Sequence, residues 1–305
     1  MNVRWVAVVV LAGCWTGSAG PVGPATGGDL DLVMPDSTYV GAIDIAGGLR
    51  APIVAPYRAA IERELQAVTA PLPPACRLDM LGSVRGVVIG AHDEGAAGSL
   101  VAHGLPTDRL RTCLVSSGGA PVAVVREGVY RIAVAGTDVE IRLVDRDTTW
   151  VRWAPHGSLV EPTSSRADPY ELRRLLARVD RSATAWAVMK PTAADLRDSW
   201  LDKDVPPPIA LAAWLRLGDG VAFDVAYRTA SATTARETAD YMRTQLQLAS
   251  AMLQLDVSMH SDGDEVTFHG AASAATLQRL MQLVGTLESF GNLGSDAGSD
   301  GSSGD

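Results

Sequence analysis

The chain carries two successive units in which a β-hairpin is followed by an amphipathic helix. In the first unit, the turn at Gly218-Asp219-Gly220 separates two apolar, β-rich runs. A three-residue loop places Leu217 opposite Val221 and Leu215 opposite Phe223, which keeps one face of the hairpin apolar throughout. A two-residue loop would set Leu215 against polar or small partners. We therefore expect the three-residue register.

The second unit has the same order. Its hairpin is expected to turn at Asp262-Gly263, a dipeptide typical of tight turns, which would set His260 opposite Glu265. Helices are expected to begin after Ser231 in the first unit and after Ser273 in the second, because a serine hydroxyl accepts a hydrogen bond from a free amide of the first helical turn. Two hairpins, each followed by a helix, favour antiparallel pairing with helical cover.

The first half of the chain follows a looser version of this plan. Short β-rich runs alternate with turns, and a helix that carries Cys113 is expected to begin at Thr107. The sequence thus predicts an α+β fold with antiparallel sheets and helices packed on one face. Whether it consists of two similar α+β halves is left open by the low identity between them.

The composition is that of a globular protein and excludes one large class of partners. The chain has 305 residues, of which 47% are hydrophobic and 20% charged, and a formal net charge of −9. No cluster of lysine and arginine interrupts this acidic character, so the electrostatic footprint of a nucleic-acid-binding protein is missing. An acidic surface would also be repelled by anionic lipid headgroups.

The first fourteen residues are typical of a secretory signal peptide. A single positive charge at Arg4 precedes an apolar run and the sequence Leu11-Ala12-Gly13-Cys14, and the run is too short to span a bilayer. The segment resembles the signal of bacterial lipoproteins, in which such a tetrapeptide is the lipobox. The resemblance implies cleavage before Cys14, a diacylglycerol thioether on its sulfur and usually a further acyl chain on its new amino terminus.

This resemblance implies an exported protein of the cell envelope, anchored to a membrane on the periplasmic or outer surface. Membrane contact would run through the acyl chains on Cys14, since two or more chains give stable anchoring. The hairpin and helix of residues 209–253 also resemble modules of exported bacterial proteins of unknown function, which carry no catalytic motif to transfer.

The cysteine count can be explained in the same way. The chain has three cysteines, and an odd number in an exported protein leaves one to be explained. If Cys14 is acylated, Cys76 and Cys113 remain. We expect them to form a disulfide in an oxidising compartment, with roughly 4 kcal/mol of stabilisation from loop closure. Two buried free thiols are the alternative, and a cytosolic location would favour it.

These features suggest the following organisation of the chain. We expect a signal peptide over residues 1–13, a Gly/Pro-rich tether over 14–30, a first α+β domain over 31–160, a second over 161–289 and a disordered Gly/Ser/Asp tail over 290–305. The boundary between the domains rests on a change of composition between Pro155 and Ala167, just before the helix start at Asp168-Pro169.

No motif for catalysis, cofactor binding or metal binding stands out. The nucleophile-elbow pentapeptide Gly-x-Ser-x-Gly, the P-loop and the dinucleotide fingerprint are all missing from the sequence, and no two histidines have His-Glu-x-x-His spacing. We therefore expect no cofactor and no metal. His92-Asp93-Glu94 could hold a cation, but a polar turn between strands has the same composition and is favoured.

One group of residues qualifies as an exposed contact surface. Trp214 is expected on the less apolar face of the first hairpin, beside Arg216 and Asp224, and exposed tryptophans are common in binding surfaces. The competing interpretation, which we favour, is that a helix covers this face.

The leading hypothesis is a non-enzymatic, lipid-anchored envelope protein that binds an unknown envelope protein or ligand, or has a structural role. A second hypothesis is an exported hydrolase whose site is assembled from dispersed residues such as His92, Asp93, His103 and Asp224. A third is a carrier of a small ligand or lipid, with an apolar cavity between helices and sheet.

Overall fold

The computed structural model describes residues 27–33, 37–70, 76, 80–92, 95–116, 122–159, 170–191, 207–253 and 256–279. The strands are β1 (Tyr39–Asp44), β2 (Gly86–His92), β3 (Ala97–His103), β4 (Val122–Arg126), β5 (Val129–Val134), β6 (Thr137–Leu143), β7 (Thr148–Pro155), β8 (Ala185–Met189), β9 (Ala210–Leu217), β10 (Gly220–Arg228), β11 (Asp256–Asp262) and β12 (Glu265–Ser273). The helices are α2 (Gly27–Val33), α3 (Ile45–Arg50), the 3-10 helix η1 (Pro52–Tyr57), α4 (Arg58–Thr69), α5 (Met80–Ser83), α6 (Thr107–Ser116), α7 (Tyr170–Leu176) and α9 (Ala232–Leu253). The expected signal peptide, most of the tether and the tail lie outside the described residues.

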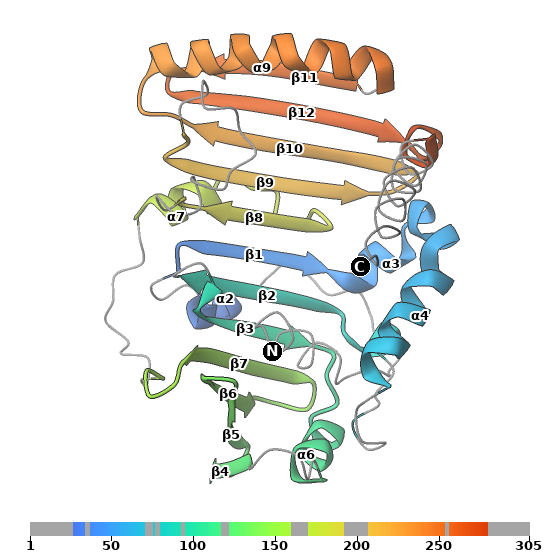
Figure 1. Cartoon of the computed structure of the whole chain (residues 1–305), viewed down its shortest axis with the longest axis vertical. Helices are drawn as coiled ribbons and strands as arrows, with labels where there is room; N and C mark the ends of the chain where they lie inside the picture. The colour runs from blue at the N-terminus through green and yellow to red at the C-terminus, as the bar shows by residue number, and fades with distance from the viewer. Residues whose placement is uncertain are drawn as a thin grey trace, which may run out of the picture.

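All these strands belong to one twelve-stranded sheet in the order β11-β12-β10-β9-β8-β1-β2-β3-β7-β6-β5-β4 (Figure 1). Neighbouring strands run antiparallel throughout, for example β1 with both β2 and β8. The predicted α+β class with antiparallel strands is therefore confirmed. The β1–β8 pair also joins the two expected domains within a single sheet, because β1 comes from the first and β8 from the second.

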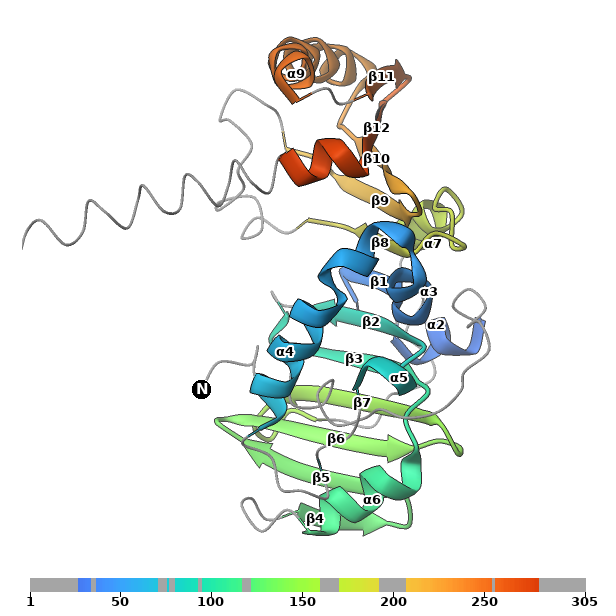
Figure 2. The same cartoon turned by 90° about the vertical axis from the view of Figure 1, so that its right-hand side faces the viewer.

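The helices lie on both faces of this sheet, which differs from the one-sided cover expected from the sequence. On one face, the α2 residue Leu30 and the α7 residue Leu172 pack against a cluster that includes Val88. On the other, the α6 residue Leu110 packs in a cluster that includes Val87. Because successive strand residues point to opposite faces, a strand that is apolar at both positions needs cover on both sides. Figure 2 shows α2 and α4 on opposite sides of β2 and β3.

Helix α2 begins before the expected start of the first domain. Gly27 to Leu30 fall in the predicted tether, yet they are helical and Leu30 is buried in the core. Ser99 on β3 donates a hydrogen bond to Leu32 O at 3.1 Å, and a side chain at Gly90 would collide with Val33 O at 2.0 Å. The helix thus lies directly on the sheet, which requires the missing side chain of Gly90.

The first hairpin has the predicted register. Leu217 pairs with Val221 and Leu215 with Phe223. The second hairpin is shifted by two residues from the prediction, because Asp262 pairs with Glu265 and His260 with Thr267. Its turn therefore centres on Gly263 and Asp264. Gly263 has φ +56°, a left-handed conformation that glycine adopts without a steric penalty.

The two predicted serine caps are present. Ser231 Oγ accepts a hydrogen bond from Thr234 N at 3.1 Å, at the start of α9. Ser273 Oγ accepts one from Thr276 N at 3.2 Å, at the start of helical residues 274–279. Within the described part of the chain, none of the helices has the length and apolar character needed to cross a bilayer.

Candidate functional site

The predicted contact residues Arg216 and Asp224 lie side by side on β9 and β10. Asp224 pairs with Trp214 across the two strands, and Arg216 with Ala222, so all of them project from the same face. Arg216 Nη1 donates a hydrogen bond to Asp224 Oδ2 at 3.2 Å. The structure therefore brings together the two charged residues that the sequence singled out.

Trp214 is placed differently from these two charged neighbours. It is half-buried and packs against the core cluster that contains Leu172 and Leu175 of α7. Its indole Nε1 is buried and meets no hydrogen-bond acceptor among the residues that the structure describes. This packing fits the covering interpretation of Trp214, with helix α7 as part of the cover, better than an exposed contact.

Arg216 also reaches the segment that follows α7. Its Nε and Nη2 donate to Asp180 Oδ2 at 3.0 and 2.7 Å. Asp180 in turn accepts hydrogen bonds from the Ser182 hydroxyl at 2.6 Å and the Ser182 amide at 2.9 Å. The Ser182 hydroxyl and Arg216 hold the pKa of Asp180 below its ordinary value, and the Asp180 carboxylate raises the pKa of Arg216.

His269 on β12 completes this group. Its Nδ1 lies 2.9 Å from Asp224 Oδ1, on the carboxylate oxygen that Arg216 does not contact. We call Asp180, Arg216, Asp224 and His269 the Arg216 cluster. Arg216 and His269 are 46% and 45% exposed at their side chains, so the cluster meets solvent. It offers hydrogen-bond donors and acceptors to a polar ligand.

A shallow hollow of about 520 Å³ lies next to the cluster. It sits where the β9–β10 turn, the first residue of β11 and the end of β12 meet. Its lining comprises Arg216, Leu217, Gly218, Gly220, Val221, Ala222, Asp256, Ala271, Ala272, Ser273 and Thr276. The charged groups at its rim are Arg216 and Asp256, with apolar side chains between them. A mixed lining of this kind fits a peptide or polar ligand rather than a lipid tail.

A second polar group connects α2 to β3 and β7. His103 Nε2 lies 3.0 Å from Asp29 Oδ1, and His103 Nδ1 lies 3.3 Å from Thr148 Oγ1. The order Asp29, His103, Thr148 is that of a proton relay ending in a hydroxyl. However, Thr148 is only 8% exposed, so a substrate carbonyl cannot reach its hydroxyl. The group therefore fastens α2 to the sheet.

The dispersed hydrolase residues proposed from the sequence do not meet. His103 lies on β3 and Asp224 on β10, which are five strand spacings apart in the sheet, or roughly 24 Å. His92 pairs with Ala97 and lies at the end of β2 opposite to the one where Gly86 pairs with His103. Asp93 lies outside the described residues. No single site can use His92, His103 and Asp224 together.

Metal binding has no support from the geometry of the described residues. His260 and His269 project from neighbouring strands, since His260 pairs with Thr267 and His269 with Ser258. No group of three or more potential ligands from His, Cys, Asp and Glu is close enough to hold a metal ion in this part of the chain.

Among the described residues, the most buried charged side chain is one that no sequence motif singled out. Glu140 on β6 is 1% exposed and accepts hydrogen bonds from Arg131 at 2.8 Å, Arg142 at 2.6 Å and Arg152 at 2.8 Å. Arg142 and Arg152 also lie over the ring of Trp150, at 4.8 and 5.1 Å from its centroid. The alternation of residues along β6 and β7 could have indicated this group in the sequence. It places three charged residues on the same face of the sheet, namely Glu140, Arg142 and Arg152.

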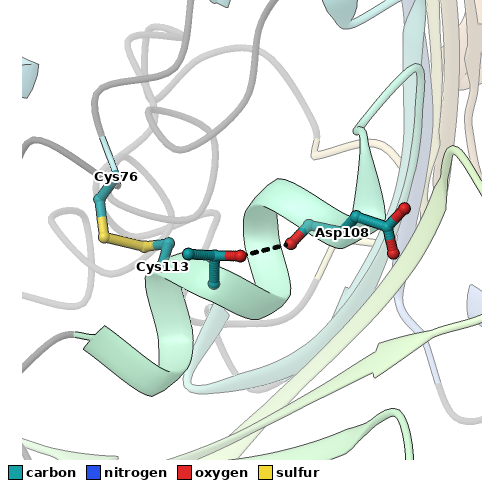
Figure 3. The surroundings of a disulfide bond; sticks show 4 residues. Cys76, Asp108 and Cys113 are labelled. Atoms are coloured by element: carbon teal, nitrogen blue, oxygen red, sulfur yellow. Dashed lines mark hydrogen bonds between the residues drawn. A yellow bond between two sulfur atoms is a disulfide. The ribbon is translucent and has the colours of Figure 1, made fainter.

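Cys76 and Cys113 form the predicted disulfide (Figure 3). It ties residue 76 to helix α6, where Thr112 next to Cys113 donates a hydrogen bond to Asp108 O at 3.0 Å. Cys14 lies outside the described residues, so its acylation stays a prediction.

Neither a protein-family model nor a curated protein matches the chain. Solved structures do resemble it. Crystal forms III and IV of TP0453 share 14% identity with this chain, cover 85% of it and are themselves covered to 98% and 96%, with TM-scores of 0.48 and 0.49. Crystal form I gives a TM-score of 0.48 over 84% of the chain. At this identity and TM-score the likeness says nothing about activity or partners.

Proposed function

We propose that this chain is a lipid-anchored protein of the bacterial envelope whose body binds a partner and does not carry out catalysis. One observation supports the anchor: Cys76 and Cys113 pair with each other, so of the three cysteines Cys14 is the one outside this bond, and it ends the sequence Leu11-Ala12-Gly13-Cys14. A lipobox cysteine has to stay out of disulfides, because its sulfur carries the thioether. The disulfide also fits an oxidising compartment.

The surface that we propose for partner binding is the Arg216 cluster with the adjoining hollow. It combines polar side chains from three strands with a concave, partly apolar floor. The β9–β10 turn at its rim is held in place, since Gly218 N donates to Gly220 O at 2.9 Å and Ile53 N donates to Gly218 O at 3.1 Å. A preformed surface of this kind binds a ligand with a low ordering cost.

The anchor is tested by acyl labelling and membrane fractionation of the full chain produced in a bacterium. We expect the wild type to take up labelled fatty acid and to sediment with membranes, and the Cys14→Ser variant to lose both properties. The matched control is the double variant Cys76→Ser/Cys113→Ser, which removes the other cysteines and should keep both. Unchanged sedimentation and unchanged mass of the Cys14→Ser variant would reject the anchor.

A further inference from the structure

One end of the sheet is an open, apolar edge. Strand β4 is the last strand in the sheet order and pairs with β5 alone among the described strands. Its sequence is Val-Ala-Val-Val-Arg, and Val124 and Val125 are 64% and 51% exposed. Alternate residues of an edge strand direct their amides and carbonyls away from the sheet, so β4 offers both apolar side chains and free backbone groups.

The opposite end of the same sheet is protected. Strand β11 exposes Asp256, Ser258, His260 and Asp262 along its length, and helix α9 packs beside it (Figure 1). Charged edge residues and helical cover are the devices by which proteins prevent edge pairing. Strand β4 carries one charged residue, Arg126, at its last position. The contrast marks β4 as the edge at which pairing is not prevented.

The apolar cluster on one face of the sheet extends as far as β4. Val124 pairs with Tyr130 and Val122 with Ile132, so both valines share the face of the cluster that contains Tyr130. Val122 is half-buried against that cluster, whereas Val124 beside it is open to solvent. A strand added at the edge would cover Val124 and continue the same apolar layer.

Two copies of β4 can pair with each other without bringing their charges together, because Arg126 is the last residue of the strand and its one charged residue. In an antiparallel pair centred on Val124, the middle residue of the strand, Val124 faces Val124, Ala123 faces Val125 and Val122 faces Arg126. The two Arg126 side chains then lie about 14 Å apart, beyond the screening length at physiological salt. A parallel pair would place them next to each other at about 4.8 Å.

We propose that β4 pairs antiparallel with β4 of a second copy of this chain, about a two-fold axis through Val124. The resulting contact is isologous, so it closes as a dimer and cannot extend into a fibre. Two features of β4 keep the contact short. The strand has five residues, and its register with β5 shifts between Val124 and Arg126. Both limit pairing to this segment.

Cysteine scanning tests the axis directly. We use the full chain with Cys14→Ser, so that an added cysteine is the sole thiol outside the disulfide and the test does not depend on the anchor. Residues directly opposite each other have Cα atoms about 4.5 to 5.5 Å apart, within the range that a disulfide bridges. Val124→Cys should therefore give a covalent dimer on mild oxidation. Val122→Cys should not, since its two copies lie about 14 Å apart.

A matched charge substitution gives the second measurement. Val124→Lys sets two ammonium groups across the axis, and we expect it to weaken association of the chain by at least about tenfold in sedimentation equilibrium. Val144→Lys, at a valine that is 53% exposed in the β6–β7 turn, should leave association unchanged. The circular dichroism spectrum of the Val124→Lys variant shows whether it is folded.

The outcomes separate the alternatives. Crosslinking through Val124→Cys with a loss of association in Val124→Lys supports the dimer. Equal crosslinking by Val122→Cys and Val124→Cys overturns the proposed axis. A wild-type chain that stays monomeric at all concentrations overturns the dimer, and so does crosslinking of the Val124→Cys chain to a different protein in cells in place of its own copy.

Discussion

Glu140 on β6 and Arg152 on β7 pair directly across the two strands, with 2.8 Å between Glu140 Oε1 and Arg152 Nη2. Two further guanidinium groups, those of Arg131 and Arg142, donate to the same carboxylate. A carboxylate that is 1% exposed would cost several kcal/mol if it were unpaired. The three arginines therefore hold β5, β6 and β7 together through one shared acceptor.

Removing this charge should destabilise the fold strongly. Glu140→Gln keeps the shape of the side chain but leaves the buried Arg152 without its carboxylate, and we expect the free energy of unfolding to fall by about 3 kcal/mol. Urea denaturation measures this difference. The control is Asp240→Asn, which breaks an exposed pair with Arg243 at 2.6 Å and should change the free energy by less than about 0.5 kcal/mol. Equal effects of the two variants would contradict the role of Glu140.

The same carboxylate predicts an acid-sensitive component of stability. Burial alone would raise the pKa of Glu140, but the hydrogen bonds from Arg131, Arg152 and Arg142 outweigh it and lower the pKa from 4.5 to about 2. Because the folded pKa lies below the unfolded one, the stabilisation is complete above about pH 4.5 and is lost as the pH falls toward 2. The difference corresponds to roughly 3 kcal/mol.

Urea unfolding at pH 7, 4 and 2.5 should show this loss in the wild type. The Glu140→Gln variant lacks the titrating group, so its stability should depend less steeply on pH over the same interval. Parallel pH profiles for the two proteins would show that other carboxylates account for the acid sensitivity.

The contact between Asp29 and His103 predicts a local effect. Asp29→Ala removes the acceptor of His103 Nε2 and should free helix α2 from the sheet, at a cost of about 1 to 3 kcal/mol. Hydrogen exchange of the amides of Gly27–Val33 should become faster, while exchange in β9 and β10 stays unchanged. Asp31→Ala, at an exposed position of the same helix, is the control and should leave exchange as it is.

The parts of this fold that depend on neighbouring residues could be predicted from the sequence. The pairing of Leu217 with Val221 follows from the alternation of a few residues around one turn. For the second hairpin the same reasoning gives a register that differs by two residues from the observed one. Asp262-Gly263 and Gly263-Asp264 are both acceptable turns, and the choice depends on which position takes a positive φ.

The parts that depend on strand order could not be predicted. Asp29 and His103 are separated by 74 positions, and they meet only because α2 folds back over β3. Likewise, one hairpin is enough to predict that Arg216 and Asp224 are neighbours. Asp180 and His269 reach them from the segment after α7 and from β12, which are placed by the order of the strands. The sequence also assigned no partner to Glu140, since Arg152 reaches it through the pairing of β6 with β7.

Two glycines that share a backbone conformation should respond very differently to substitution. Gly104 has φ +94° and Gly136 has φ +83°, so alanine is strained at both positions, by about 1 to 2 kcal/mol. At Gly136 the space around an added Cβ is open, so the backbone strain is the whole loss of stability.

At Gly104 a Cβ would lie 1.7 Å from Ser83 O, and Gly104 N also donates to Asp147 O at 2.7 Å. We expect Gly136→Ala to lower the free energy of unfolding by about 1 kcal/mol and Gly104→Ala to lower it several-fold more or to prevent folding, as measured by urea denaturation. Similar losses in the two variants would mean that the segment around Ser83 can shift without cost. The backbone hydrogen bond from Arg85 N to His103 O and the ion pair of Arg85 with Asp147 argue against this.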